Sequence, residues 1–353
     1  MSKHLLVDPA AQEGLKTAEK SAQRMQVFNF VPELYADYYK QHGYAHVKNG
    51  VTAEFLQFAR KTAQRLIDEQ RDIKAFEIKN KKLQFLFDFP DGADYPRGVY
   101  ETVARVAGLP IEKMTLCERH IKAYEDIAEK NPPPHKDRVA SQLAVGIPLE
   151  VPEDSYLILY PDDHLTVNPY TSTALWRSSL DEKDLPENVL KDIEPVKIDT
   201  RPGDVILLRG SSIYHERVNP AHTVLLYLKF NAMRLDPVGE DPYTHEQRKK
   251  SFEILKTKSD VELLDSQIEV SPRLENITRL YTRLHWKEVL QARLWGEKEF
   301  TISEMELQLF RKVDGKKTVR QLMEELGIPD LEHVSAVPMI RRLGVLGGID
   351  FLN

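Results

Sequence analysis

The stretch from His135 to Lys229 constrains the fold of this chain most, because two histidines and an aspartate lie there among short apolar runs. His135 and Asp137 are two residues apart, and alternate residues of a strand share a face, so both side chains can face one atom. His215 follows a Gly-Ser-Ser turn and supplies a second imidazole. Two imidazoles and one carboxylate on one side of a metal suit non-haem Fe(II) and leave coordination positions open.

The residues around this set predict β structure. The apolar runs Leu143–Leu149 and Tyr156–Tyr160 follow Asp137, and a Pro-Gly turn over Arg201–Asp204 introduces a further apolar run at Val205–Leu208. Short apolar runs separated by turn signals are typical of a β-sandwich or barrel. A histidine near an acidic residue is common by chance. His135 and Asp137 therefore indicate a metal site only together with the predicted strands around them.

The segment before the histidines predicts mixed helices and strands. Each helix has a start or stop signal, such as Thr52 as an N-cap or Gly43 and Gly108 as ends. The predicted elements are a helix from Pro32 to Gly43, a strand at 44–48, a helix after Thr52, a helix at about 97–107 and a strand at 116–124.

Over roughly residues 30–235 this arrangement resembles the iron- and 2-oxoglutarate-dependent dioxygenases. In that family a double-stranded β-helix carries His-x-Asp near one strand, and a Pro-Gly-Asp turn commonly precedes the second histidine. The opening order of helix, Gly-Tyr-Ala-His-Val and Val-Thr-x-Glu-Phe-Leu is similar to the phytanoyl-CoA hydroxylase branch. The resemblance implies an α+β chain with a jelly-roll core and N-terminal helices.

The resemblance also implies an activity. His135, Asp137 and His215 would bind Fe(II), with 2-oxoglutarate and O2 as co-substrates. The expected reaction is hydroxylation of an unactivated C–H bond in a small molecule or amino-acid derivative, with release of succinate and CO2. Halogenases of the family lack the carboxylate, so Asp137 favours hydroxylation.

The distal carboxylate of 2-oxoglutarate requires a buried cation, because an unpaired buried charge is very costly. The family usually places an arginine or lysine on the strand after the second histidine, but Leu225 lies where that arginine would fall. Lys229 is the preferred candidate, because it shares strand parity with Tyr227 and with Thr223, a second residue expected at the co-substrate. Arg217 is the alternative.

Other candidates come from flanking segments. In the family the strand before His-x-Asp lines the pocket, so Tyr124 is expected at the co-substrate and Arg119 at the substrate. The polar insertion at 162–197 is long for a compact barrel and predicts a functional loop such as a lid. Trp176 and Arg177 in this insertion are further candidates for substrate contact.

The chain of 353 residues has room for more than one domain. The predicted organisation is a mobile arm or surface helix at 1–30, a dioxygenase domain at 31–240, a helical connector at 241–295 and a winged-helix-like domain at 296–353.

The C-terminal segment predicts three short helices, beginning at Ser303, at Thr318 and near Leu331, and a hairpin. It resembles a winged helix and the small PqqD-type peptide-binding domains. Residues 301–353 contain seven Lys or Arg against eight Asp or Glu, so nucleic-acid binding is disfavoured. Docking against the barrel or a second subunit, as in a homodimer, is preferred to capture of a peptide strand.

Composition excludes further classes. Cys117 is the only cysteine, so no intrachain disulfide forms. The net charge of −6 disfavours nonspecific nucleic-acid binding, and no apolar run reaches membrane-spanning length. The N-terminus lacks a signal-peptide pattern, so a cytoplasmic protein without a membrane partner is expected. Two alternatives stay open: a hydroxylase of peptide or protein side chains, and a cupin-like metal-binding sensor without redox chemistry.

Overall fold

The structure is a computed structural model that describes residues 25–71, 82–90, 95–126, 128, 132–161, 166–282, 287–296 and 298–353. Over these residues the chain divides into two compact units, and the boundary falls between Arg234 and Leu235. We call them the N-terminal unit and the C-terminal unit. No helix in the described part of the chain combines the length and the apolar character needed to cross a membrane.

The N-terminal unit opens with the predicted helix–strand–helix order. Helix α2 (Glu33–His42) ends at Gly43, whose φ of 75° is easy for glycine, and the chain then enters β1 (Tyr44–Val47). Thr52 accepts a hydrogen bond from the Phe55 N–H and so caps α3 (Ala53–Arg71). These elements confirm the predictions from the N-cap and glycine signals.

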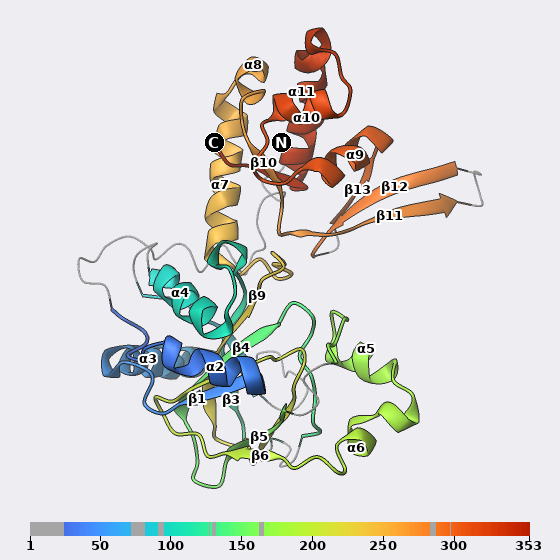
Figure 1. Cartoon of the computed structure of the whole chain (residues 1–353). Coiled ribbons are helices and arrows are strands. Elements are labelled where there is room, and N and C mark those ends of the chain that lie inside the picture. The colour runs from blue at the N-terminus through green and yellow to red at the C-terminus, as the bar shows by residue number, and fades with distance from the viewer. Residues whose placement is uncertain are drawn as a thin grey trace. The chain divides into compact units, whose positions relative to one another are not determined.

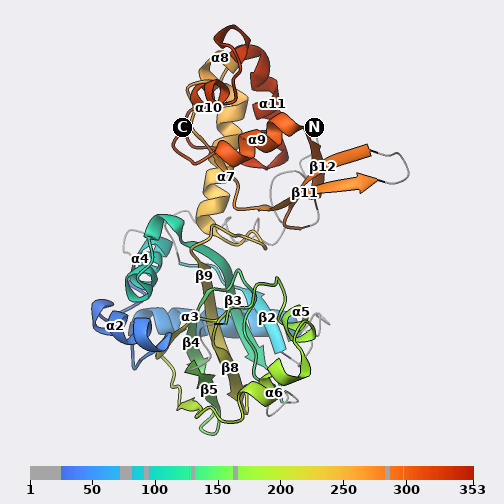
Figure 2. The same cartoon turned by 45° about the vertical axis from the view of Figure 1, so that its right-hand side comes forward.

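Most strands of this unit form one antiparallel sheet of six strands, in the order β1-β7-β4-β9-β3-β2. The strands other than β1 are β2 (Lys82–Leu86), β3 (Thr115–Tyr124), β4 (Leu143–Glu150), β7 (Val205–Leu208) and β9 (Val224–Asn231). Figure 2 shows β3, β4 and β9 side by side in the middle of this sheet.

A second antiparallel sheet contains β6 (Val196–Ile198), β5 (Tyr156–Tyr160) and β8 (Tyr214–Val218) in that order. An isolated antiparallel bridge joins His135 to His215 of β8, so the segment around His135 adds to the edge of this sheet. Two antiparallel sheets in this arrangement are consistent with the predicted jelly-roll core.

The two faces of the six-stranded sheet differ. On β9, Leu226, Leu228 and Phe230 belong to the larger apolar core, which also includes residues of α3 and of α4 (Tyr95–Ala107). Figure 1 shows α2, α3 and α4 gathered on this side. The alternate residues Tyr227 and Lys229 line a cavity on the opposite side. The strand alternation therefore separates a packed face from a face available for chemistry.

The insertion between β5 and β6 contains short helices. They are α5 (Thr173–Ser178), η4 (Glu182–Asp184) and α6 (Pro186–Val189); one further 3-10 turn, η2 (Ile111–Lys113), precedes β3. Ser172 accepts hydrogen bonds from the N–H groups of Ala174 and Leu175, and thus caps α5.

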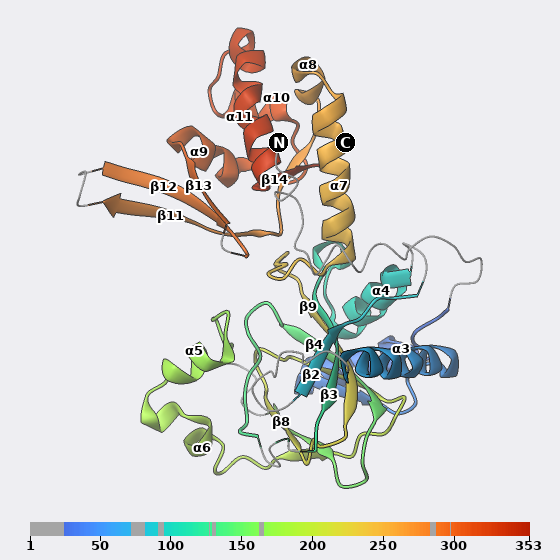
Figure 3. The same ribbon diagram turned by 180° about the vertical axis from the view of Figure 1, so that it is seen from behind.

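The C-terminal unit begins with α7 (Pro242–Thr257) and α8 (Asp260–Leu263). The strands β10 (Ile268–Val270), β11 (Leu274–Thr282), β12 (Lys287–Leu294) and β13 (Lys298–Ile302) follow. The prediction of charged helices over 244–295 is therefore wrong after α8. Strands β11, β12 and β13 form a separate antiparallel sheet in chain order, whose long β11–β12 ribbon is visible in Figure 3.

Three helices follow: α9 (Glu304–Lys312), α10 (Val319–Glu325) and α11 (His333–Leu346), with a 3-10 turn, η5 (Asp330–Glu332), before the last. Ser303 and Thr318 cap the first two helices in capping boxes, as predicted. The final strand β14 (Ile349–Phe351) pairs with β10 instead of forming a hairpin after α11. One apolar core unites residues from α7 to β14.

Candidate metal centre and its cavity

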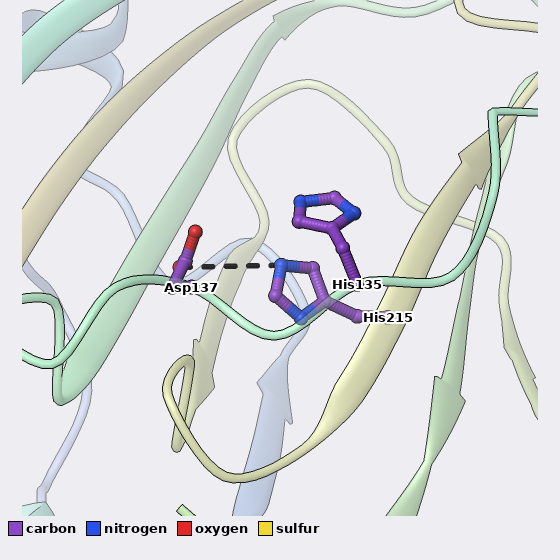
Figure 4. Close-up of side chains that lie close together, drawn as sticks. All are labelled: His135, Asp137 and His215. Atoms are coloured by element: carbon purple, nitrogen blue, oxygen red, sulfur yellow. Dashed lines mark ion pairs between the residues drawn. The ribbon is translucent and has the colours of Figure 1, made fainter. Parts of the chain in front are cut away.

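Three predicted ligands lie together in the N-terminal unit. One ligand atom from each of His135, Asp137 and His215 lies within 4.8 Å of the others. The His215 Nε2 is 4.0 Å from the Asp137 Oδ2, the pair joined by the dashed line in Figure 4. His135 and Asp137 come from one stretch of chain and His215 comes from β8 (Figure 4).

Backbone hydrogen bonds fix this arrangement. The N–H of His135 donates to the carbonyl of His215, and the N–H of His215 donates to the carbonyl of His135, each at 3.0 Å. The N–H of Asp137 donates to the carbonyl of Gly210 at 2.8 Å. The three side chains are therefore held by strand pairing rather than by a free loop, which preorganises them for one shared atom.

The two carboxylate oxygens of Asp137 have different surroundings. Oδ1 accepts a hydrogen bond from the Lys229 Nζ at 2.6 Å, whereas Oδ2 is buried and has no hydrogen-bond partner among the described residues. A Cβ added to Gly210 would lie 2.5 Å from Oδ2, so a larger residue there would crowd this oxygen. A buried acceptor without a partner costs free energy. The donor set therefore fits a cation bound between Oδ2 and the two imidazoles.

The protonation states also suit a metal. Burial lowers the pKa of His135 to about 3 and, more than any other cause, lowers the pKa of His215. Burial alone would raise the pKa of Asp137, but the charge of Lys229 holds it below its ordinary value. His215 Nδ1 lies 2.9 Å from the Ile213 carbonyl, which fixes the proton on Nδ1 and leaves the Nε2 lone pair open. Neutral imidazoles and an ionised carboxylate are the forms that bind metals.

The three ligands open onto a cavity of about 120 Å³ between the two sheets. Six of the residues predicted for metal or co-substrate line it: His135, Asp137, His215, Tyr124, Arg217 and Lys229. Burial, more than the nearby Tyr227, raises the pKa of Tyr124, so its phenol is protonated. Tyr227, which strand parity placed on the face of Lys229, lines the cavity as well, and the lining residues that sequence reasoning missed include Lys122, Gly146, Leu157, Pro132 and Pro220.

Arg217 lines this cavity from β8. The residue is 7% exposed, and its Nη1 donates to the Thr200 hydroxyl at 3.2 Å and, more weakly, to the Ser155 hydroxyl at 3.5 Å. Its Nε has no partner, and no carboxylate of the described residues forms an ion pair with it. Thr223 contacts the same group, because its hydroxyl donates to Ser155 at 3.2 Å.

Lys229, the preferred cation in the sequence analysis, lies elsewhere. Its Nζ pairs with the Asp137 carboxylate, and both side chains are 9% exposed. Burial alone would lower the pKa of Lys229, but the Asp137 carboxylate raises it, so the ammonium stays charged. Leu225 faces the cavity at the position where the family pattern expects an arginine.

The three predicted substrate contacts lie outside the cavity lining. Arg119 is buried, and its guanidinium binds the Phe87 carbonyl and the Asp88 carboxylate. The Trp176 indole N–H donates to the Tyr214 hydroxyl at 3.3 Å. The positions of these side chains depend on partners distant in sequence, which strand parity alone does not identify.

Arg177 is exposed and forms an ion pair with Glu187 inside the same insertion. The described part of the insertion is tied to the metal-ligand segment: the Asn168 amide donates to the Asp137 carbonyl at 2.9 Å. The fully buried Lys136 donates to the Thr166 carbonyl at 2.6 Å. These contacts brace the ligands, whereas a lid was predicted; residues 162–165 lie outside the described part.

Among the missed residues, Lys122 had a usable signal. It lies two residues before Tyr124 on β3, so strand alternation places both on one face. Its Nζ lies 4.9 Å from the centre of the Tyr227 ring. Ser155 and Thr200 lie in loops without a periodic pattern, and only the folded chain brings their hydroxyls to Arg217.

Comparison with known proteins gave matches only among solved structures. No protein-family model and no curated protein matches the chain. The non-haem alpha-ketoglutarate-dependent epimerase SnoN from nogalamycin biosynthesis is 18% identical, with 56% of this chain and 82% of that chain covered and a TM-score of 0.41.

Two further solved structures are similar to a comparable extent. EctD from S. alaskensis with 2-oxoglutarate and 5-hydroxyectoine is 16% identical, with 62% of this chain and 81% of that chain covered and a TM-score of 0.40. A Pseudomonas putida prolyl-4-hydroxylase is 12% identical, with 56% of this chain and 96% of that chain covered and a TM-score of 0.38. All three TM-scores are below 0.5.

Proposed function

We propose that this chain is an Fe(II)- and 2-oxoglutarate-dependent dioxygenase. It would hydroxylate an unactivated C–H bond of a small molecule or amino-acid derivative and release succinate and CO2. The observation that carries the proposal is the partnerless Asp137 Oδ2, which faces His135 and His215 at one end of a buried cavity. Such a set binds Fe(II) facially and leaves positions for a chelating co-substrate and for O2.

The cavity supplies the second requirement of this chemistry. A dicarboxylate that chelates the metal with one end needs a cation for the other end, because an unpaired buried charge is very costly. Arg217 is buried, faces the cavity and has only hydroxyl partners. We therefore assign the distal carboxylate of 2-oxoglutarate to Arg217, with the hydroxyls of Ser155 and Thr200 orienting the guanidinium. This assignment replaces Lys229, whose charge is already matched by Asp137.

The bound metal would supply O2 activation coupled to oxidative decarboxylation of 2-oxoglutarate. The residues of this chain would hold the metal and shield the reacting carbon from water. His135, Asp137 and His215 hold three positions, and the strand pairing around them preserves their geometry. The apolar lining, which includes Leu157, excludes water from the reacting carbon. Because Asp137 fills the third protein position, no protein-ligand position is left for a halide, which favours hydroxylation.

The test is succinate formation by the purified chain with Fe(II), 2-oxoglutarate and O2. These enzymes turn over their co-substrate slowly even without substrate, so the assay does not need the substrate to be known. His135→Ala, Asp137→Ala and His215→Ala should each abolish turnover and Co(II) binding while circular dichroism stays native. Asp199→Ala, which removes an exposed carboxylate, is the matched control. Full turnover by Asp137→Ala would refute the proposal, and metal binding without succinate would favour a non-redox sensor.

A second candidate, a hydroxylase of peptide side chains, is favoured by one observation. The three-stranded sheet of the C-terminal unit has β11 and β13 as its edge strands. Edge strands carry backbone groups without strand partners, to which an extended peptide can add. A free amino acid and the same residue within a peptide should then differ in turnover. Hydrogen exchange that slows in β11 or β13 when the peptide is added, but not in α10, would support this candidate.

A further inference from the structure

We propose that Lys229 is a positioning residue that serves as a permanent counter-ion for the metal-ligating carboxylate of Asp137. In this role it keeps the metal site ordered without a metal and weakens the affinity for divalent cations. The inference rests on the proposed metal centre, and it concerns a contact that the centre itself does not require. It gives Lys229 a function different from binding the co-substrate.

The geometry separates the two oxygens of Asp137 by function. The Lys229 Nζ lies 2.6 Å from Oδ1, a charge-assisted contact between two side chains that are each 9% exposed. Oδ2 has no partner and lies 4.0 Å from the His215 Nε2. Lys229 therefore occupies one oxygen and leaves the other directed at the imidazoles, which favours monodentate ligation by Asp137.

A second carboxylate, that of Glu118, also feels the charge of Lys229, which helps to hold the pKa of Glu118 below its ordinary value against its burial. Glu118 lies across from Lys229 on the neighbouring strand β3, and it is buried as well. Its carboxylate is already bound by Arg138, whose Nη2 lies at 2.7 Å, and by the Ser141 hydroxyl at 2.9 Å. Glu118 therefore has hydrogen-bond donors of its own, and the direct contact of the Lys229 ammonium is with Asp137.

Small residues make room for this pair. Lys229 on β9 is opposite Ala144 on β4, and the Gly210 backbone lies beside the Asp137 Oδ2. A Cβ built at Gly210 would approach both the Asp137 Oδ2 and the Ala144 Cβ, at 2.5 Å and 3.3 Å. The packing thus holds the carboxylate between a lysine and a glycine, which fixes its orientation before any metal arrives.

The ammonium of Lys229 has opposite effects on the stability of the metal-free chain and on its affinity for a divalent metal. Without a metal, the ammonium compensates a buried carboxylate that would otherwise be unpaired, so it stabilises the folded chain. With a divalent metal at Oδ2, the same ammonium repels the metal, so it lowers the affinity. A lysine with a merely structural role, by contrast, would raise both the stability and the affinity.

The experiment measures both quantities on the full chain. Co(II) replaces Fe(II), because it is stable in air and its absorption reports binding. Lys229→Met should lower the Tm of the metal-free protein and tighten Co(II) binding by roughly tenfold or more. Lys229→Arg keeps the charge, so both its metal-free Tm and its Co(II) affinity should stay near the wild-type values. Lys197→Met breaks an exposed lysine–aspartate pair and should change neither the Tm nor the Co(II) affinity.

The double variant Lys229→Met with Asp137→Asn protects the test against a misfolded single variant. It removes both charges, so its metal-free form should be more stable than Lys229→Met alone. Equal or lower stability of the double variant would overturn the proposal. Unchanged or weaker Co(II) binding by Lys229→Met would also overturn it. Weaker 2-oxoglutarate binding with unchanged Co(II) affinity would do so too and return Lys229 to the co-substrate.

The proposed function fails in a different way. If the wild type does not bind Co(II), the metal centre itself is wrong, and this inference falls with it. If the wild type binds Co(II) but forms no succinate, the dioxygenase proposal fails, whereas the opposite shifts in stability and affinity at Lys229 still decide the counter-ion role. The two proposals are therefore separated by the wild-type measurement.

Discussion

Among the cations that line the cavity, Lys229 and Arg217 have the same exposure and different partners. Lys229 and Arg217 are both 7% exposed. Lys229 contacts the carboxylate of a proposed metal ligand at 2.6 Å. Arg217 contacts only hydroxyls, of which Thr200 at 3.2 Å is the nearer. Burying a charge without a counter-charge is costly, so the two positions call for different explanations.

The difference indicates which cation awaits a ligand. The charge of Lys229 is balanced within the fold, so Lys229 contributes to the fold and to the metal site. The charge of Arg217 is balanced only when an anion enters the cavity, which makes Arg217 the better candidate for the co-substrate. Sequence parity could not separate them, because both residues share a face with the expected site. Whether a buried charge already has a partner is the information that the folded chain adds.

The substitution Arg217→Met tests this difference between the two cations most strongly. Deleting one partner of a buried charge pair costs about 3–5 kcal/mol, so the affinity for 2-oxoglutarate should fall by roughly 10²- to 10⁴-fold. Co(II) affinity should not change, because Arg217 does not contact the ligands. Calorimetric titration of the Co(II)-loaded protein with 2-oxoglutarate measures the effect.

Controls define the outcome for Arg217. Arg177→Met removes an exposed arginine outside the cavity and should leave 2-oxoglutarate binding unchanged. Arg217→Lys should retain part of the affinity, since the charge remains but the planar group is lost. Native 2-oxoglutarate affinity in Arg217→Met, together with a large loss in Lys229→Met, would reverse the assignment of the two cations.

A smaller effect is expected from Gly210→Ala, which tests the open oxygen of Asp137. The added Cβ would lie 2.5 Å from Oδ2 and 2.9 Å from the Ser141 carbonyl, so the carboxylate or the backbone must shift. We expect Co(II) affinity to fall by about tenfold, because a displaced ligand loses its geometry. The Oδ1 contact with Lys229 lies on the other side of the carboxylate and should persist.

Gly98→Ala is the matched control, because a Cβ there meets nothing within 4 Å and the residue lies in α4. It should leave Co(II) affinity at the wild-type value. If Gly210→Ala binds Co(II) as tightly as the wild type, then Oδ2 is not the oxygen that faces the metal.

Local signals predicted most elements of the N-terminal unit. Gly43 ends α2, Thr52 caps α3, and the apolar runs became β4, β5 and β7. These features depend on neighbouring residues, and so the sequence contains them. The same holds for His135 and Asp137, whose spacing of two matches a strand.

Features built from distant contacts were not predictable. Strand β10 exists because it pairs with β14, about eighty residues later in the chain. Arg119 was assigned to the substrate from its strand, but its guanidinium binds Asp88. The hydroxyls of Ser155 and Thr200 meet Arg217 from separate loops. In each case the partner is specified by the tertiary fold and by no local pattern.

The smallest expected effect concerns a buried carboxyl group in the C-terminal unit, that of Asp236. Asp236 is fully buried; its Oδ1 accepts hydrogen bonds from the N–H groups of Gly239 and Glu240, whereas Oδ2 has no partner. Burial, followed by the nearby Asp241, raises the pKa of Asp236 well above its ordinary value. A carboxyl whose pKa is raised by folding favours the folded state at low pH, and this contribution is lost as the pH rises above the unfolded value of about 4.

Asp236→Asn keeps the acceptor for both N–H groups and removes the charge, so it should raise the Tm by a few degrees at neutral pH. The gain should shrink at acidic pH, where the wild-type carboxyl is protonated. Thermal melts of both proteins across that range measure the difference. Asp265→Asn, at an exposed carboxylate that pairs with Arg320, provides the control and should give no such gain. A lower Tm at neutral pH in Asp236→Asn would mean that this carboxylate, like that of Asp137, has a charged partner that compensates its burial.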